Sequence, residues 1–484
     1  MDTSLSPVPL AANPSHPGAR AILFGLAALF LLIVTGFVWR TGMYWLLGVF
    51  LIMAGVFFRK GLKRLFFVLA FFMPFLQGGP RSDLYMVAPL LEVILLVFFL
   101  LWFLETVRGR AVLPGLSSQH MPWLPFFGVA VVSAVVACAA RVQAMGLPAD
   151  GFELSAILFQ HSMLGPFYPA RALYSFLEMF LLFQYVRSNL ERQDIEKLAR
   201  TVVASACLVN LIGLIVYFTV DLSQYFQGVN RATSVFSGPN QFATCLLMGL
   251  PLSAALLWTA RDRWSRGFAV FSLVTGLPVL YFTRSQGAWL AAAAVPLLLV
   301  LFLPKADAVS IGRKRWLAVL ALGGVGLATA GYFVATRTAE QLNALTDGRY
   351  FLFLAGLEMV RASPLVGVGL GNFYQLLGDF YPSGIVGRAQ HEHAHNMYLQ
   401  VLAELGLVGF VLLLWPIWML LRRAFSGALQ QGLTLGLLAA VLGVLLHSLT
   451  DYTLLIISTA MMFSVVMGML AVLTEPSPAS SAPG

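Results

Sequence analysis

The chain has 484 residues, of which 59% are hydrophobic and 11% are charged. Soluble domains carry about 25% charged residues, so this composition excludes a water-soluble fold and indicates an integral membrane protein. The formal net charge of +9 arises mainly from cations in alternate loops and gives no reason to expect a nucleic-acid partner.

A polar, Pro-rich stretch over 1–19 is expected to be a disordered tail. Apolar blocks follow, mostly of about 16–24 residues, the length that crosses about 30 Å of hydrocarbon as a helix. The shortest block is broken by Pro74. Fourteen blocks can be marked: 21–39, 43–58, 65–78, 84–104, 122–140, 172–186, 201–220, 241–260, 268–282, 288–303, 316–336, 397–420, 430–449 and 454–473.

The blocks predict an all-α, polytopic membrane protein with about 12–14 transmembrane helices. We divide it into N-terminal transmembrane helices over 20–200 and a second transmembrane domain over 201–474. A second disordered tail is expected over 475–484. The three cysteines form no CxxC pair, which supports neither a disulfide framework nor a cysteine metal site.

Successive loops of a multi-spanning protein lie on opposite sides of the membrane, and this rule divides the cations into two sets. One side holds 20 of the 30 Lys and Arg residues, including every lysine, so the positive-inside rule predicts that this side and both termini are cytoplasmic. The outer side carries only arginine, whose planar fork suits phosphate or carboxylate. A codon bias toward arginine would explain the same excess. The outer arginines are Arg40, Arg81, Arg141, Arg171, Arg231, Arg284, Arg337, Arg349, Arg361 and Arg388.

The longest outer loop, 337–396, is too long to be idle linker and too apolar to be disordered. Its segment RYFLFLAGLEMVRA (349–362) predicts a helix too short to span the bilayer. We expect this helix at the membrane interface, with Phe351 and Leu354 in the acyl boundary. The following GVGLG (367–371) is expected to be a turn rather than a backbone cradle for phosphate.

Three histidines, His391, His393 and His395, stand at alternate positions at the end of this loop. On an extended strand they would share a face, so a metal site is one interpretation. The other is a single working base: His395 lies where the loop meets a spanning helix, and an imidazole there can take a proton from a hydroxyl near neutral pH.

Gln400 and Glu404 follow on one helix face. A carboxylate one to two turns into the bilayer is costly, so Glu404 either orients the site from beneath or forms a structural pair with a neighbouring helix.

Further polar residues gather at the outer ends of the apolar blocks. Arginines with one histidine, and without a Ser or Cys nucleophile motif, suggest transfer of a group already activated by phosphate. Their depth suggests that a lipid carries this group. The outer clusters are Arg231 with Asn240, Arg284 beside Gln286, Arg349 after Asp347, and Asp451 after His447.

Four segments occur in a familiar order: NRATSVFSGPNQFA (230–243), TRSQGAWLA (283–291), DGRYFLFLAGLEMVRASPLVGVGLGNF (347–373) and HAHNMYLQVLAELGLVG (393–409). This order resembles the O-antigen ligase and O-antigen polymerase superfamily. The resemblance covers roughly residues 200–473 and is strongest in the last two segments, whereas residues 1–200 match only as a run of spanning segments.

The resemblance implies a GT-C-like glycosyltransferase of the bacterial inner membrane, with its active site facing the periplasm. Such enzymes take a glycan from undecaprenyl diphosphate and pass it to a sugar hydroxyl, without metal or other cofactor. The acceptor is lipid A-core for a ligase or a lipid-linked glycan for a polymerase, which would have a polysaccharide chain-length regulator as partner. A transporter or flippase for the same lipid is the alternative, although no clear internal repeat supports it.

The resemblance also implies roles for particular residues. His395 matches the histidine proposed as the base, Arg349 the arginine that opens the periplasmic helix, and Arg231 the arginine before the Gly-Pro-Asn turn. The family often has Ser-Arg-Gly where this chain has Ser-Gln-Gly over 285–287, which leaves the role of Arg284 open. The residues expected to bind diphosphate or glycan are Arg231, Arg284, Arg349, Asn240, Asn396 and Glu404.

Overall fold

The computed structural model describes residues 45–76, 87–113, 123–146, 163–226, 228–302, 328, 332, 335–346, 348–381, 393–427 and 432–475. Over these ranges all regular structure is helical, which confirms the predicted all-α class. The predicted tail 1–19, the predicted block 21–39, nearly all of block 316–336 and the end of the second tail lie outside the described residues.

Each predicted block within the described ranges is a helix. An apolar segment has no other way to satisfy its backbone hydrogen bonds in hydrocarbon, which is why the blocks convert directly into helices. The helices are α2 (Trp45–Lys60), α3 (Leu62–Phe72), α4 (Val87–Val107), α5 (Leu124–Ala144), α7 (Tyr168–Asn189), α8 (Arg192–Thr219), α9 (Pro239–Thr259), α10 (Arg263–Phe282), α11 (Gln286–Phe302), α16 (Met397–Gly427), α17 (Gly432–His447) and α18 (Ile457–Thr474).

Six helices in the described part of the chain are long and apolar enough to cross a membrane, so the protein is polytopic. They are α5, α8, α9, α10, α16 and α18. Two shorter apolar helices, Gln286–Leu299 and Gly432–His447, lie among them. The total of 12–14 spans stays a prediction.

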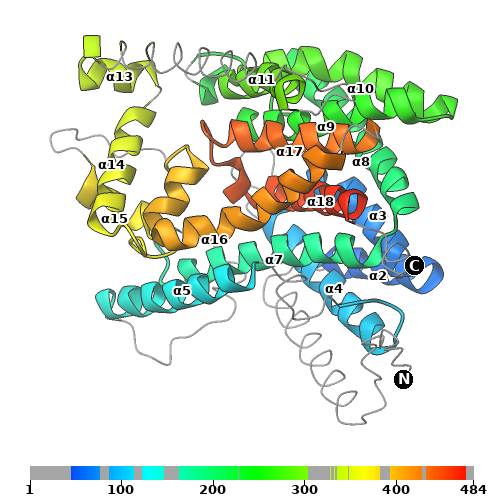
Figure 1. Ribbon diagram of the computed structural model, residues 1–484, viewed down its shortest axis with the longest axis horizontal. Helices are drawn as coiled ribbons and strands as arrows, with labels where there is room; N and C mark the ends of the chain where they lie inside the picture. Colours follow the sequence, from blue (N-terminus) through cyan, green and yellow to red (C-terminus); the bar gives the residue numbers. More distant parts are fainter. Residues whose placement is uncertain are drawn as a thin grey trace, which may run out of the picture.

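The helices form a bundle around α18, the most completely covered of the six spans, which packs on α7 and α17 (Figure 1). The neighbouring pair α9 and α17 approaches closely because Gly436 carries no side chain. A Cβ at that position would lie 2.4 Å from the Cβ of Ala255. Within lipid there is no hydrophobic driving force between helices, so small residues stabilise such crossings by allowing close packing.

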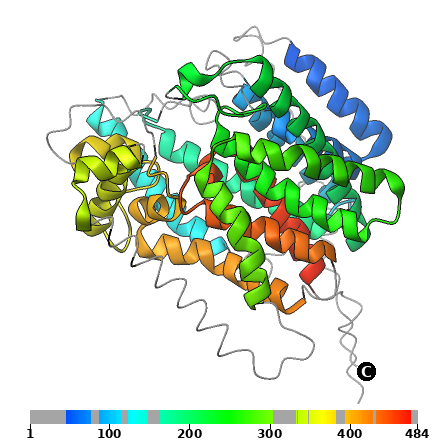
Figure 2. The same ribbon diagram turned by 90° about the horizontal axis from the view of Figure 1, so that it is seen from above.

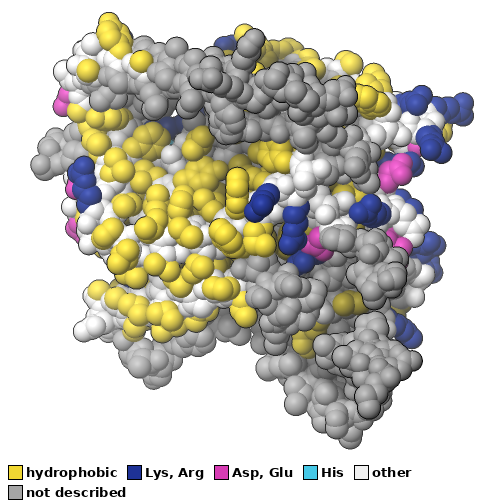
Figure 3. Space-filling model, viewed as in Figure 1, with side chains coloured by type: hydrophobic (Ala, Val, Ile, Leu, Met, Phe, Trp, Pro, Cys, Tyr) yellow, Lys and Arg dark blue, Asp and Glu magenta, His cyan; other side chains and the backbone are white. Residues whose placement is uncertain are grey.

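The loop helices lie together at one end of the bundle. In Figures 1 and 2, α13 (Ala339–Leu345), α14 (Arg349–Ala362) and α15 (Phe373–Phe380) form a group at the left-hand end. Figure 3 shows a broad apolar surface across the middle of one face, with Lys and Arg side chains gathered toward the opposite, right-hand end. Which end of the bundle faces the cytoplasm stays a prediction from the positive-inside rule.

Helix α14 has the bounds that the sequence predicts, but its surroundings differ from the expectation. Phe351 is 3% exposed and its ring contacts that of Tyr381, so its predicted place in the acyl boundary is wrong. The reason is that α15 and the start of α16 fold back over α14. A separate small core forms there, with Leu352, Met359 and Phe373 at its centre.

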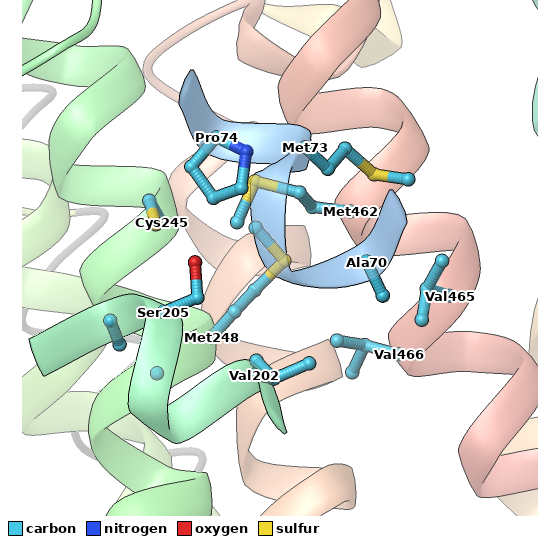
Figure 4. Close-up of a pocket in the computed structure, with 12 residues that line it drawn as sticks. Ala70, Met73, Pro74, Val202, Ser205, Cys245, Met248, Met462, Val465 and Val466 are labelled. Atoms are coloured by element: carbon cyan, nitrogen blue, oxygen red, sulfur yellow. The ribbon is translucent and has the colours of Figure 1, made fainter. Parts of the chain in front are cut away.

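The short block around Pro74 becomes α3 followed by a 3-10 turn, η1 (Met73–Leu76), because proline has no N–H to continue the helix. A small apolar pocket lies beside this turn, between η1, α8, α9 and α18 (Figure 4). Met73, Met248 and Met462 line it, side chains flexible enough to fill irregular space. None of the predicted site residues lines this pocket.

Candidate active site at the loop end of the bundle

A buried carboxylate, Asp451, collects several of the predicted site residues. It lies between α17 and the 3-10 turn η5 (Thr453–Leu455) and is 2% exposed. Its Oδ2 accepts a hydrogen bond from Asn240 Nδ2, and lies 3.8 Å from His395 Nδ1 and 4.0 Å from Arg349 Nη2. Its Oδ1 accepts from the Tyr452 amide at 2.8 Å. Residues more than two hundred positions apart thus meet at one anion.

Local packing explains why Asp451 reaches this position. Helix α17 ends at His447, and the Thr450 amide donates to the His447 carbonyl at 2.9 Å, which turns the chain back toward α11. Gly287 in the first turn of α11 makes room, since a Cβ there would lie 1.9 Å from Thr450 Oγ1. The Thr450 carbonyl, beyond the end of the helix, accepts a hydrogen bond from Arg349 Nη1 at 2.9 Å.

Arg231 joins the group through Asn240. Its Nη2 donates to Asn240 Oδ1 at 3.2 Å, and its Nε donates to the Thr283 carbonyl at 2.8 Å. Asn240 therefore accepts from an arginine with its oxygen and donates to Asp451 with its nitrogen. This arrangement also fixes the orientation of the Asn240 amide.

Arg284 lies at the rim of this group. The residue is exposed, and its guanidinium lies over the ring of Tyr281, 5.6 Å from the ring centre. Its neighbour Ser285 points inward and its hydroxyl lies 3.2 Å from His447 Nε2. The structure thus brings Arg231 and Arg349 to Asp451 but leaves Arg284 apart from it, and a diphosphate-binding role for Arg284 stays a prediction.

Below the charged group, a layer of hydroxyls joins four elements. Thr244 Oγ1 lies 3.0 Å from His447 Nδ1 and 2.8 Å from Thr453 Oγ1. Together with Ser285, which directly precedes α11, this layer connects α9, the start of α11, α17 and η5 and holds the end of α17 in place.

The ring of Tyr452 is shared by two histidines. Its centre lies 4.8 Å from that of His395 in an edge-to-face arrangement and 4.3 Å from that of His393. Burial, and then repulsion from His395 when that ring is protonated, lowers the pKa of His393 to about 3, against the opposing effect of Asp451. His393 is therefore neutral in the folded protein. His391 lies outside the described residues. Among the residues that the structure describes, no group of three or more metal-ligating side chains comes together.

The Asp451 carboxylate is held in its charged form. Burial by itself would raise its pKa. The contact with His395, and the positive charge that His447, His395 and Arg349 carry when protonated, outweigh burial and bring the pKa below its ordinary value. A buried charge of this kind persists only where partners offset its desolvation, which the surrounding donors and cations do.

Three residues in the segments that build this site have a strained backbone. Among the described residues, the non-glycine residues with positive φ are Ser234 (55°), Arg284 (55°) and His395 (49°). All three lie in segments that the sequence resemblance singles out. Conformations of this kind persist only where the surrounding structure fixes them, and they cluster at functional sites.

Two of the residues predicted to bind substrate form hydrogen bonds with backbone amides. Asn396 caps α16, since its Oδ1 accepts from the Leu399 amide at 3.0 Å. The carboxylate of Glu404 accepts from the amides of Gly371 at 2.9 Å and Phe373 at 3.2 Å. The Gly371 amide closes the Gly-rich segment and the Phe373 amide opens α15. The Gly-rich segment is thus a turn bound within the protein, as predicted.

The sequence pattern indicated Asp451 together with His447 but assigned Asp451 no role. It gave no indication of Tyr452. The available signal was an acidic residue just beyond the outer end of an apolar block. The role of Asp451 depends on the packing of α9 beside α17, which brings Asn240 to the Asp451 carboxylate.

Residues 271–414 match the sequence model of the O-antigen ligase family. The match runs from α10 to α16 and includes Arg284, Arg349 and His395, whereas Arg231 and Asp451 lie outside it. The chain is thus a polytopic membrane protein that carries an O-antigen ligase family domain, and the resemblance drawn from the sequence is confirmed.

The chain is also similar to an individual protein of known name. The chain is 25% identical over 251 residues to the exopolysaccharide production protein ExoQ of Rhizobium meliloti (strain 1021). The similar region covers 49% of this chain and 55% of that protein, so the chain spans about half the length of the curated relative that it matches. The two proteins are distant homologues.

Proposed function

We propose that this protein is a glycosyltransferase of the bacterial inner membrane that acts in cell-surface polysaccharide synthesis. It transfers a glycan from undecaprenyl diphosphate to a sugar hydroxyl on the periplasmic face. The observation that carries the proposal is the buried Asp451 carboxylate, which lies beside His395 and Arg349 at the loop end of the bundle. Similarity to an exopolysaccharide production protein favours polymerisation over ligation to lipid A-core.

In this mechanism His395 is the general base. Its Nδ1 faces Asp451, so the acceptor hydroxyl gives its proton to Nε2 on the other edge of the ring. The imidazolium that forms is stabilised by the Asp451 charge. The 3.8 Å separation is longer than a hydrogen bond, and such contacts commonly shorten when substrate binds.

The acceptor oxygen attacks the anomeric carbon of the donor sugar as the bond from that carbon to the diphosphate oxygen breaks. The diphosphate leaves with the electron pair, and Arg231 and Arg349 offset its developing negative charge. Because the attack is in line with the departing oxygen, the anomeric configuration is inverted. The fork of each guanidinium suits the phosphate oxygens better than a point charge does.

The test uses purified protein in detergent with a lipid-linked oligosaccharide as donor and acceptor, and follows chain length on a gel. The wild-type protein should lengthen the glycan, and His395→Ala should make no product although it reaches the membrane in normal amount. His16→Ala, in the predicted amino-terminal tail, is the matched control. Near-normal product from His395→Ala would remove His395 from the mechanism. Movement of the lipid across vesicles without chain growth would favour a carrier instead.

A further inference from the structure

Gln400 and Glu404 are buried on one face of α16, beneath the histidine segment. Both carboxylate oxygens of Glu404 act as acceptors. Oε2 accepts from the Gly371 amide at 2.9 Å, and Oε1 accepts from the Phe373 amide at 3.2 Å and from Gln400 Nε2 at 2.8 Å. The Gln400 carboxamide oxygen in turn accepts from the Ala394 amide at 2.8 Å. A continuous line of hydrogen bonds joins the Gly-rich turn to the histidine segment.

The Gly-rich turn is a firm anchor for this line. Arg141, at the outer end of α5, donates to the Gly371 carbonyl at 2.6 Å and to Asn372 Oδ1 at 2.9 Å. On the other side, α16 is interrupted at Gly406, where a Cβ would lie 2.3 Å from the carbonyl carbon of Leu365. The turn is thus clamped between two helices, with its amides directed at Glu404.

The line of hydrogen bonds ends beside a strained residue. His395 has φ +49°, a conformation that an L residue keeps only when its neighbours fix it. The preceding residue, Ala394, is held by Gln400. The two following residues are held as well, since Asn396 caps α16 and the Met397 amide donates to the Ser448 carbonyl at 3.0 Å in the turn after α17.

We propose that the Gln400–Glu404 pair is a positioning device for His395. Glu404 receives three N–H donors and orients the Gln400 carboxamide, whose oxygen fixes Ala394 and through it the left-handed conformation of His395. Neither side chain contacts substrate. The catalytic consequence rests on the proposed function, whereas the effect on the His395 ring rests only on the hydrogen bonds.

The polarity of the pair makes this proposal testable. A carboxylate at position 404 offers only acceptors to its three donors, so Glu404→Gln places an amide N–H₂ against an N–H group. Gln400→Glu removes the donor to Glu404 and places two acceptors together. In the double exchange Gln400→Glu/Glu404→Gln, the new carboxylate accepts from both the Ala394 amide and the new carboxamide. The line of hydrogen bonds is then restored with reversed polarity, at the cost of one bond to the Gly-rich turn.

The kinetic test compares the two single variants, the double exchange and Glu358→Gln. Glu358, exposed on α14 in a surface ion pair with Arg361, is the matched control. Each single variant should lower kcat about 10–100-fold per folded enzyme, with little change in KM, because a small displacement of the base is costly. The double exchange should regain about tenfold over either single variant. A normal kcat in Glu404→Gln, or no recovery in the double exchange, would overturn the proposal.

A second measurement does not depend on activity. The chain has seven histidines, so ring resonances of histidine-labelled protein in detergent can be assigned by loss of one signal in His395→Gln. The His395 signal should move in Glu404→Gln and return toward its wild-type position in the double exchange, while Glu358→Gln leaves it unchanged. An unmoved signal in Glu404→Gln would overturn the positioning role. Failure of the wild-type protein to transfer glycan would count against the proposed function alone.

Discussion

Replacing Asp451 by Asn tests the centre of the proposed site. The substitution keeps the size of the side chain and removes its charge, which lies 3.8 Å from His395 Nδ1 and 4.0 Å from Arg349 Nη2. We expect kcat to fall strongly because the imidazolium formed during proton transfer loses its counter-charge. The stability of the protein should change less than its activity, since the Tyr452 amide can still donate to an amide oxygen at position 451.

The size of the effect follows from Coulomb's law. Two unit charges about 4 Å apart interact by about 4 kcal/mol at an effective dielectric of about 20. If the proton is about half transferred in the transition state, about 2 kcal/mol is lost, or about 30-fold in kcat. Full transfer would raise the loss to nearly 10³-fold. The expected decrease for Asp451→Asn therefore lies between these two values.

The assay is the same glycan extension by purified enzyme, with folded protein measured by size-exclusion chromatography. Asp221→Asn is the matched control, because Asp221 is exposed in another loop and accepts a hydrogen bond from the Ser223 amide, which asparagine can also accept. A folded Asp451→Asn enzyme with kcat within about threefold of wild type, well short of the about 30-fold expected, would show that the carboxylate does not stabilise the imidazolium, and the mechanism would need another role for it.

Three further predictions follow from the same geometry. Arg349→Lys should lower kcat/KM for the donor about 10–100-fold, because a point charge replaces the guanidinium fork; a wild-type value would contradict diphosphate binding by Arg349. Gly287→Ala should cost about 1–3 kcal/mol of stability and impair activity, since the new Cβ would lie 1.9 Å from Thr450 Oγ1, whereas Gly128→Ala, which meets open space, should do neither. The pKa of His393, about 3 in the folded protein, lies below its ordinary value, so the unfolded chain binds a proton first as the pH falls. Stability should therefore decline below about pH 6.5 toward pH 3, by about 2 kcal/mol at pH 5, and His393→Gln should flatten this dependence in thermal melts at pH 7.5 and 5; an equal decline in both proteins would refute the burial argument.

Several features of the fold could be read from the sequence because they are local. Apolar blocks become helices since backbone groups in hydrocarbon need internal partners. Helix α14 begins at Arg349 and ends at Ala362 as predicted, because Pro364 two residues later cannot continue a helix. The segregation of cations into alternate loops likewise depends only on the order of blocks and charges.

The composition of the site was only partly readable. Arg231, Arg349, Asn240 and His395 were all predicted and come together. The residue that gathers them, Asp451, received no role, because a single acidic residue in a short turn carries no periodic signal. Its importance comes from convergence of α9, α14, α16 and the α17–η5 turn.

The sequence could not predict the directions in which particular side chains point. Glu404 and Asn396 were expected to contact substrate, and the structure directs both toward backbone amides. Phe351 was expected in the acyl boundary, and it is buried with its ring against that of Tyr381 instead. In each case the residue type was a sound indication that the segment matters, but the direction of the side chain depends on which neighbour packs against it.

The sequence by itself therefore determined that this protein is a helical membrane protein. It also predicted that ten arginines and the histidine segment lie on the side opposite the lysines. Span length, charge segregation and capping are all properties of short segments. The tertiary structure decided which of these residues share one buried carboxylate, which ones hold the loops, and that His395 is fixed in a left-handed conformation beside Asp451. Contacts between positions hundreds of residues apart are set by helix packing, and no local pattern encodes them.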